Sequence, residues 1–284
     1  NYNVTIGDEA GTAITTGDNN TALGYSSLAA NTTGTRNTAV GTSAGTAITT
    51  GGNNTVMGYN ALATNTVGDR NVAIGEGALQ THNPSSNADT YNVAVGYDAG
   101  NAVTTATHNT LIGALAGDSL TTGASNVAVG YGALTTDDVG QHNVAIGRDA
   151  LSAQNIASAA NTYNTAVGSS AGAAVTTGTS NTLIGGLAGN ANTTGGNNTF
   201  VGKSAGVANT TASSNTFVGE RAGTANTTGD ESVAVGQFAY SANTTGVDNV
   251  AIGRSALAAN TTAHNNVAIG RSALLSNTTG TRNA

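Results

Sequence analysis

The chain has 284 residues, of which 8% are charged, 4% are aromatic and 40 are glycine. In a typical globular domain about a quarter of the residues are charged, so we expect no compact, aromatic-rich core in this chain. The net charge of −7 excludes the basic surface of a nucleic-acid binder, the absence of cysteine excludes disulfides and thiolate metal sites, and no apolar run is long enough to span a membrane.

A five-residue motif, typified by Asn-Val-Ala-Ile-Gly at residues 71–75, recurs along the whole chain. Its first residues are Asn3, Asn20, Asn37, Asn54, Asn71, Asn92, Asn109, Asn126, Asn143, Asn164, Asn181, Asn198, Asn215, Ser232, Asn249 and Asn266. These starts are 17 residues apart, except for two intervals of 21. A fixed period of this length is typical of solenoids. We therefore predict one repetitive all-β domain over residues 1–284, a parallel β-roll of about 16 coils.

Each residue is described below by its position in its coil, counted from the first residue of the motif. Positions 2 to 4 predict a short strand, and position 5 is glycine in all sixteen coils, which predicts a bend that tolerates no Cβ. Position 4 is always aliphatic, as at Ile74. Because alternate side chains share one strand face, we expect positions 2 and 4 to point into the coil.

Position 3 lies on the opposite strand face and is also apolar in almost every coil. Strands that are apolar on both faces are usually buried on both. We therefore predict that position 3 forms an inter-subunit face, represented by Ala22, Ala39, Ala73, Ala94, Leu111, Leu183, Phe200 and Phe217. The alternative is a flattened coil, in which position 3 packs against a second strand of its own chain.

The second half of the coil has leucine or glycine at position 9 in fifteen of the sixteen coils. Position 12 is not aliphatic where position 9 is leucine, and is often aliphatic where position 9 is glycine, as at Gly45 and Ile48. This exchange predicts one cavity that is filled from either side. Thr-Thr-Gly at positions 13 to 15 predicts a turn, and the two longer coils carry four extra residues in this closing loop, within 82–91 and 154–163.

Asparagine occupies position 1 in fifteen of sixteen coils. Identical amides stacked in register hydrogen-bond to one another, so we predict a structural ladder that includes Asn20, Asn37, Asn54, Asn71, Asn92, Asn109, Asn126 and Asn143. The first and last coils do not differ from internal ones, as capping repeats would. We therefore expect a longer parent chain or end-to-end stacking into a filament.

The motifs at residues 71–75, 143–147, 249–253 and 266–270, each followed three residues later by alanine, resemble the head repeat of trimeric autotransporter adhesins of the YadA type. The resemblance covers essentially the whole chain, although the family unit is usually shorter in its loop. It implies a left-handed roll, a homotrimer, and export to a bacterial surface where it binds host matrix or other surfaces. Similar repeats occur in phage tail-fibre-like proteins, so a virion fibre is the alternative carrier.

Several exposed-looking residues are candidates for binding. Tyr25, Tyr59, Tyr97 and Tyr131 share position 6 and could stack on sugar rings, and Arg254 and Arg271 share it on adjacent coils, where they could receive an anionic group. The sequons at Asn31, Asn192, Asn226, Asn243 and Asn277 match the glycosylation pattern.

The sequence gives no sign of catalysis, a cofactor or a metal site. The four histidines fall in loops of different coils, where we expect them to be solvated, and the paired acids lack calcium-loop spacing. We therefore predict a non-enzymatic extracellular fibre segment that attaches to surfaces, matrix proteins or glycans. The alternative from a different functional class is an ice-binding β-solenoid, because threonine recurs at position 14.

Overall fold

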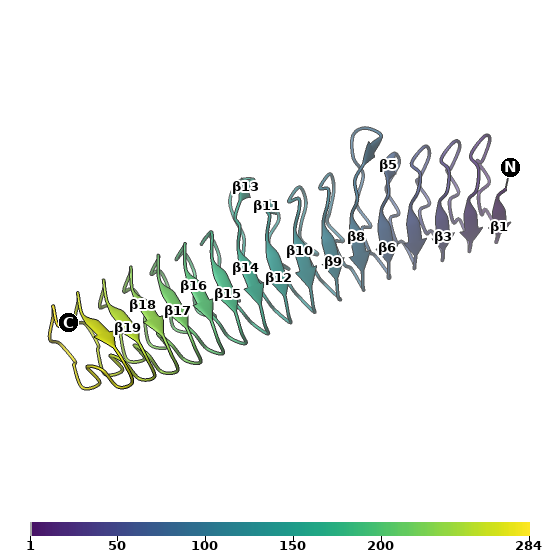
Figure 1. Ribbon diagram of the computed structural model, residues 1–284. Helices are drawn as coiled ribbons and strands as arrows, with labels where there is room; N and C mark the ends of the chain where they lie inside the picture. Colours follow the sequence, from purple (N-terminus) through teal and green to yellow (C-terminus); the bar gives the residue numbers. More distant parts are fainter. Residues whose placement is uncertain (1) are drawn as a thin grey trace. The chain divides into compact units, whose positions relative to one another are not determined.

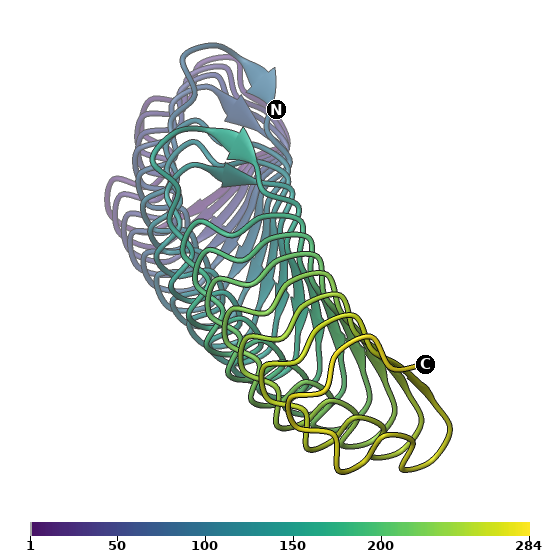
Figure 2. The ribbon, with the colours of Figure 1, turned by 90° about the vertical axis from the view of Figure 1, so that its left-hand side faces the viewer.

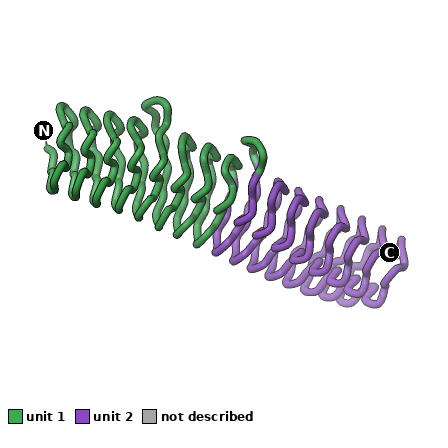
Figure 3. Tube along the Cα trace, turned by 180° about the vertical axis from the view of Figure 1, so that it is seen from behind, with its two compact units in different colours: residues 1–142, 156–161 green, residues 143–155, 162–284 purple. Residues whose placement is uncertain are grey.

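The computed structural model describes residues 2–284, which contain strands and turns and no helix. The fold is a parallel β-solenoid of about 16 turns with a spacing of about 17 residues, as predicted from the repeat. The structure consists of two compact units (Figure 3). Unit 1 comprises Asn1–His142 and Ile156–Asn161, and unit 2 comprises Asn143–Asn155 and Thr162–Ala284.

The main sheet of unit 1 has one three-residue strand from each coil (Figure 1). The strands are β1 (Val4–Ile6), β2 (Thr21–Leu23), β3 (Thr38–Val40), β4 (Thr55–Met57), β6 (Val72–Ile74), β8 (Val93–Val95), β9 (Thr110–Ile112) and β10 (Val127–Val129). Neighbouring strands are parallel, and each residue pairs with the equivalent residue of the next coil, as Thr5 does with Ala22. This register stacks equivalent side chains into continuous rows.

Unit 2 repeats the arrangement with a second set of strands. They are β12 (Val144–Ile146), β14 (Thr165–Val167), β15 (Thr182–Ile184), β16 (Thr199–Val201), β17 (Thr216–Val218), β18 (Val233–Val235), β19 (Val250–Ile252) and β20 (Val267–Ile269). All of these pairs are also parallel and in register.

The two insertions lie in the closing loops, where they were predicted, and each loop adds a short strand pair. β5 (Gly68–Asp69) pairs with β7 (Ala88–Asp89), and β11 (Gly140–Gln141) pairs with β13 (Ala160–Asn161). Both inserted segments end in Thr-Tyr. The threonine hydroxyl has the same role in each, since Thr90 donates to Asn71 Oδ1 at 2.8 Å and Thr162 donates to Asn143 Oδ1 at 2.6 Å.

The interior of each unit is lined by position 3 rather than by positions 2 and 4. Every position-3 residue named above as an inter-subunit face is fully buried within its own chain: Ala22, Ala39, Ala73, Ala94, Leu111, Leu183, Phe200 and Phe217. The assignment of position 3 to a subunit interface is therefore wrong, and the flattened coil is the correct alternative. The reason is that the second half of each coil folds back over this face of the strand (Figure 2), so position 3 is covered by its own chain.

The predicted cavity exchange between positions 9 and 12 is confirmed, because Leu28 and Ile48 are both fully buried. Position 9 has positive φ whichever residue occupies it, +49° at Leu28 and +57° at Gly45. A Cβ added at Gly45 would lie 2.9 Å from Ile48 Cδ1. Position 3 fills the same space in other coils, since a Cβ at Gly206 would lie 2.6 Å from the ring of Phe200.

Glycine at position 5 follows from close stacking of the bend. At Gly24 φ is +131°, and a Cβ there would lie 2.7 Å from the carbonyl carbon of Gly41 in the next coil. Larger residues are excluded by both the backbone conformation and the distance. The bend turns the chain sharply after the strand, which places position 6 at the corner of the coil.

Candidate binding surfaces

The side chains at position 4, together with valine at position 2 in eight coils, form an outer apolar strip on each unit, and the other eight coils have threonine at position 2. The large apolar residues with the greatest exposure are Val4, Ile6, Leu23, Met57 and Ile112 in unit 1, and Ile146, Ile184, Ile252, Val267 and Ile269 in unit 2, with exposed fractions from 37 to 69%. Eight strands at the usual spacing give each strip a length of roughly 34 Å. Continuous exposed apolar patches of this kind usually mark an interaction site.

The position-6 row lies at the corner that follows the strip, and its residue types vary from coil to coil. In unit 1 it carries the four predicted tyrosines, Tyr25, Tyr59, Tyr97 and Tyr131, all of them exposed. The hydrogen-bonded Asp98 carboxylate raises the pKa of Tyr97. The row therefore presents aromatic rings together with acidic groups to solvent.

In unit 2 the same row is more basic, with Arg148, Lys203, Arg254 and Arg271. Arg254 and Arg271 are exposed on adjacent coils, and the Ser272 N–H donates to the Arg254 carbonyl at 2.9 Å, which keeps the two coils in register. Neither arginine forms an ion pair with another described residue. The structure thus places the two guanidinium groups on one row without neutralising them.

The position-1 asparagines are buried and stacked, but their main bonds go to the backbone. Asn20 Oδ1 accepts the Asn37 N–H at 2.9 Å, and Asn37 Nδ2 donates to the Gly51 carbonyl at 2.8 Å. Some steps add an amide-to-amide bond, as from Asn54 to Asn37 at 3.1 Å. The ladder therefore ties each strand both to the next coil and to the closing turn of its own coil.

A second amide ladder, which the sequence analysis did not identify, occupies position 12 inside unit 2. Its side chains donate in succession along Asn209 to Asn192, Asn226 to Asn209, Asn243 to Asn226, Asn260 to Asn243 and Asn277 to Asn260, at 2.7 to 3.4 Å. Of the sequons named above, Asn31, Asn192, Asn226 and Asn243 are fully buried at this position. Those asparagines cannot be glycosylated in the folded chain. The available signal was that position 12 is aliphatic in other coils.

The threonine doublet at positions 13 and 14 divides into two roles. Position 13 donates its hydroxyl to the next coil, as Thr32 does to the Thr49 carbonyl at 3.2 Å. Position 14 is exposed in every coil where it is threonine: Thr16, Thr33, Thr50, Thr105, Thr122, Thr177, Thr194, Thr211, Thr228, Thr245, Thr262 and Thr279. Each unit therefore presents one outward row of threonine.

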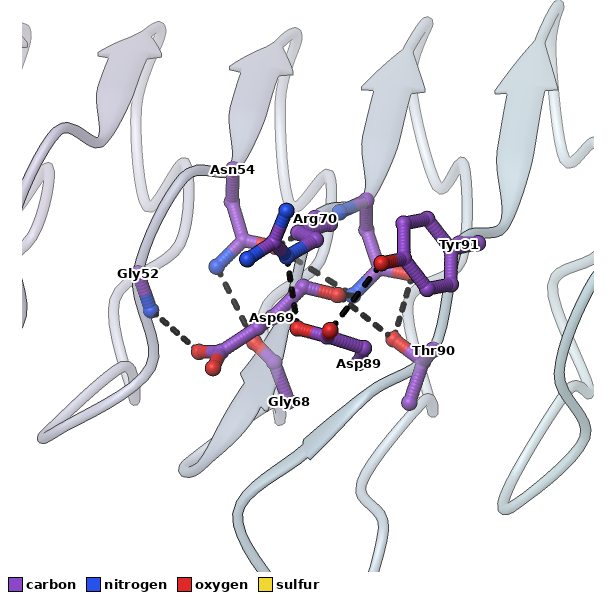
Figure 4. Close-up of polar contacts among 9 residues, drawn as sticks. Gly52, Asn54, Gly68, Asp69, Arg70, Asp89, Thr90 and Tyr91 are labelled. Carbon is purple, nitrogen blue, oxygen red and sulfur yellow. Dashed lines mark hydrogen bonds and ion pairs between the residues drawn. The ribbon is translucent and has the colours of Figure 1, made fainter.

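The first insertion is held by a polar cluster that links several coils (Figure 4). Arg70 Nε contacts Asp89 Oδ1 at 2.6 Å, and the Tyr91 hydroxyl donates to Asp89 Oδ2 at 3.0 Å. These hydrogen bonds to Asp89 raise the pKa of both Arg70 and Tyr91. The Asp69 carboxylate accepts the Gly52 N–H at 2.6 Å. The cluster fixes the loop, and the shared Thr-Tyr ending was a sequence signal for it.

The expectation that all four histidines are solvated is wrong for His82. His82 occupies position 12 and is fully buried, and neither ring nitrogen has a hydrogen-bond partner among the described residues. Burial away from water lowers the pKa of His82 to about 4. His264 lies nearer the surface and accepts the Val247 N–H at 3.0 Å.

Residues 2–284 contain no pocket and no group of three or more residues that could hold a metal ion. Over the same range, no helix is long and apolar enough to cross a bilayer. Comparison with protein-family models gives no match, and comparison with curated proteins gives none either. The candidate sites are therefore the exposed rows of the solenoid.

Proposed function

We propose that this chain is a non-enzymatic segment of an extracellular fibre, and that three copies associate through their outer apolar strips into a left-handed homotrimeric roll. The observation that carries the proposal is the outer row of aliphatic side chains at position 4, all of them exposed or half-buried, which valine at position 2 widens in eight of the sixteen coils. Removing such area from water is worth about 25 cal/mol per Å². A strip on a linear repeat is matched in length and register by another copy of itself.

The variable position-6 row provides the adhesive part of the proposal, because it stays outside the strip and differs between the two units. We propose that it attaches the fibre to a host surface, a matrix protein or a glycan. The carrier is a bacterial cell surface or, as the alternative, a virion fibre. The resemblance of the repeat to YadA-type heads supports the first of these, and the sequence flanking this segment in its parent protein distinguishes them.

Light scattering of the purified chain tests the association. We expect the mass of three chains for the wild type and a lower mass for the double variant Met57→Glu and Ile112→Glu, which puts two charges on the strip of unit 1. The matched control is Thr50→Glu and Thr122→Glu, at exposed positions away from the strand, which should keep the trimer mass. A wild-type chain that is monomeric at all concentrations overturns the trimer.

Binding of the wild-type chain to cells, immobilised matrix proteins and glycan arrays tests adhesion. The wild-type chain should stay bound to at least one of these targets after washing. Variants in which the tyrosines or the arginines of the position-6 row are replaced by alanine should no longer bind that target. A chain that binds none of them is not adhesive, and the proposal then reduces to a structural spacer.

Ice binding is the second candidate, and the exposed threonine row at position 14 favours it. The position-13 hydroxyls are used in the backbone ladder, so the threonine doublet offers one outward threonine rather than two. Thermal hysteresis and ice-crystal shape decide this candidate directly. Hysteresis that disappears on replacing Thr177, Thr194 and Thr211 by lysine would establish ice binding in place of adhesion.

A further inference from the structure

The position-6 row of unit 1 has a tyrosine on every second coil. Tyr25, Tyr59, Tyr97 and Tyr131 belong to the second, fourth, sixth and eighth coils, and their exposed fractions are nearly equal, from 51 to 56%. The coils between them carry Thr42, Glu76 and Ala114 at the same position. The row is therefore a regular alternation of aromatic and smaller or polar side chains.

The fold does not require tyrosine at these places. The Tyr59 carbonyl accepts the Gly77 N–H at 3.1 Å, and the Ala114 carbonyl accepts the Gly132 N–H at the same distance. Alanine thus supports the same coil-to-coil bond as tyrosine. A large ring that is half exposed and structurally dispensable is available for binding.

The spacing of the rings follows from the in-register stacking of the coils. Parallel strands lie about 4.8 Å apart, so tyrosines on alternate coils recur about every 9.6 Å. One sugar ring of an extended β-1,4-linked chain spans slightly more than one strand spacing. Successive rings in such a chain are turned over, so the same ring face recurs at every second sugar. The period of the row is therefore close to the two-sugar period of the glycan.

The surrounding charges restrict the ligand further. Glu76 is an exposed member of the row, and Asp98 lies at the adjacent position beside Tyr97. Carboxylates accept hydrogen bonds from sugar hydroxyls and repel anionic polymers. We infer that the alternating tyrosines of unit 1 bind an extended, neutral β-1,4-linked polysaccharide, with one sugar per coil and a tyrosine beneath every second sugar. This inference rests on the proposed adhesive function and names its ligand class.

Affinity electrophoresis of the full chain in gels containing hydroxyethylcellulose tests the inference, with soluble β-1,3-glucan and α-1,4-glucan gels in parallel. We expect retardation only in the β-1,4-glucan gel. Loss of one ring in Tyr59→Ala should weaken binding by about tenfold, as expected for a well-packed aromatic contact. Loss of all four rings should abolish it. The control Tyr163→Ala removes an exposed tyrosine outside the row and should leave binding unchanged.

A variant with the same number of tyrosines tests the spacing itself. Tyr59→Thr combined with Thr42→Tyr moves one ring by one coil, so binding should fall as far as in Tyr59→Thr alone. Equal affinity of this variant and the wild type, equal retardation by the α-1,4-glucan, or no retardation by the β-1,4-glucan overturns the inference. If the variant that lacks all four tyrosines of the row still binds cells or matrix proteins, the adhesive function stands and only the inferred ligand class is wrong.

Discussion

Ser232 is the only first residue of a coil that is not asparagine, and Tyr240 takes over the bond that it cannot make. In other coils the asparagine Nδ2 donates to the carbonyl at position 15, as Asn215 does to Gly229 at 2.9 Å. In this coil the Tyr240 hydroxyl donates to the equivalent Gly246 carbonyl at 2.8 Å. The Ser232 hydroxyl in turn accepts the Asn249 N–H at 3.2 Å. Two substitutions in one coil thus compensate each other.

We predict that Ser232 and Tyr240 are energetically coupled. Tyr240→Leu alone removes a buried hydroxyl together with its hydrogen bonds, and should lower the free energy of unfolding by about 1–3 kcal/mol. Adding Ser232→Asn restores the arrangement of the coil at Asn20, which has leucine at position 9, and should recover at least about 1 kcal/mol. Urea unfolding of the two single variants and the double variant gives the coupling. Additive effects would show that the two residues act independently.

The buried imidazole of His82 should make stability depend on pH. Its pKa is lowered from 6.5 to about 4 in the folded chain, so between these values the unfolded chain binds more protons than the folded one. Stability should therefore fall as the pH falls from 6.5 toward 4, by at most about 3 kcal/mol. His82→Asn, which matches Asn65 in the preceding coil, should remove this component in urea unfolding at pH 4 to 7. The exposed His108→Asn is the control, and an equal effect of both variants would contradict the prediction.

At the scale of the strand and its coil, the sequence predicted the period, the strand positions and the location of both insertions, because each depends on repetition alone. It did not predict which strand face is internal. Position 2 is valine or threonine and positions 3 and 4 are apolar in almost every coil, so little polar–apolar alternation orients the strand. The uniformly aliphatic position 4 therefore suggested the interior. The narrow coil instead accepts Ala73 inside and leaves Ile74 half-buried outside.

The filling of the coil interior can be tested by exchanging one coil type for another. Gly206→Leu alone should cost about 1–3 kcal/mol, because its Cβ would meet the Phe200 ring. Phe200→Ala alone leaves a cavity and should cost about 3–5 kcal/mol. The double variant reproduces the coil that contains Ala251 and Leu257, and should be more stable than Phe200→Ala. Thermal unfolding decides this, and a double variant less stable than both single variants would show that the coils are not interchangeable.

At the scale of the whole chain, stability should be a sum over coils and over the interfaces between neighbouring coils. Equivalent residues pair across each interface, so the 17-residue step is the only shift that keeps every side chain on its row. Within unit 2, the Asn164 Oδ1 accepts the Asn181 N–H at 2.9 Å, and Asn181 Oδ1 accepts the Asn198 N–H at 3.1 Å. Removal of one complete coil would bring Asn198 directly onto Asn164.

We predict that deletion of residues 181–197 leaves a folded solenoid, whereas deletion of residues 181–196 does not. The 17-residue deletion removes one coil and one interface and preserves the strand faces and both amide ladders. The 16-residue deletion turns Phe200 toward the outside of the coil and moves the asparagines of positions 1 and 12 out of register. Hydrogen-exchange protection should therefore be lost in the coils on both sides of the deletion. Far-ultraviolet circular dichroism and exchange measurements compare the two variants. Equal protection in both would mean that the coils do not depend on their stacking register.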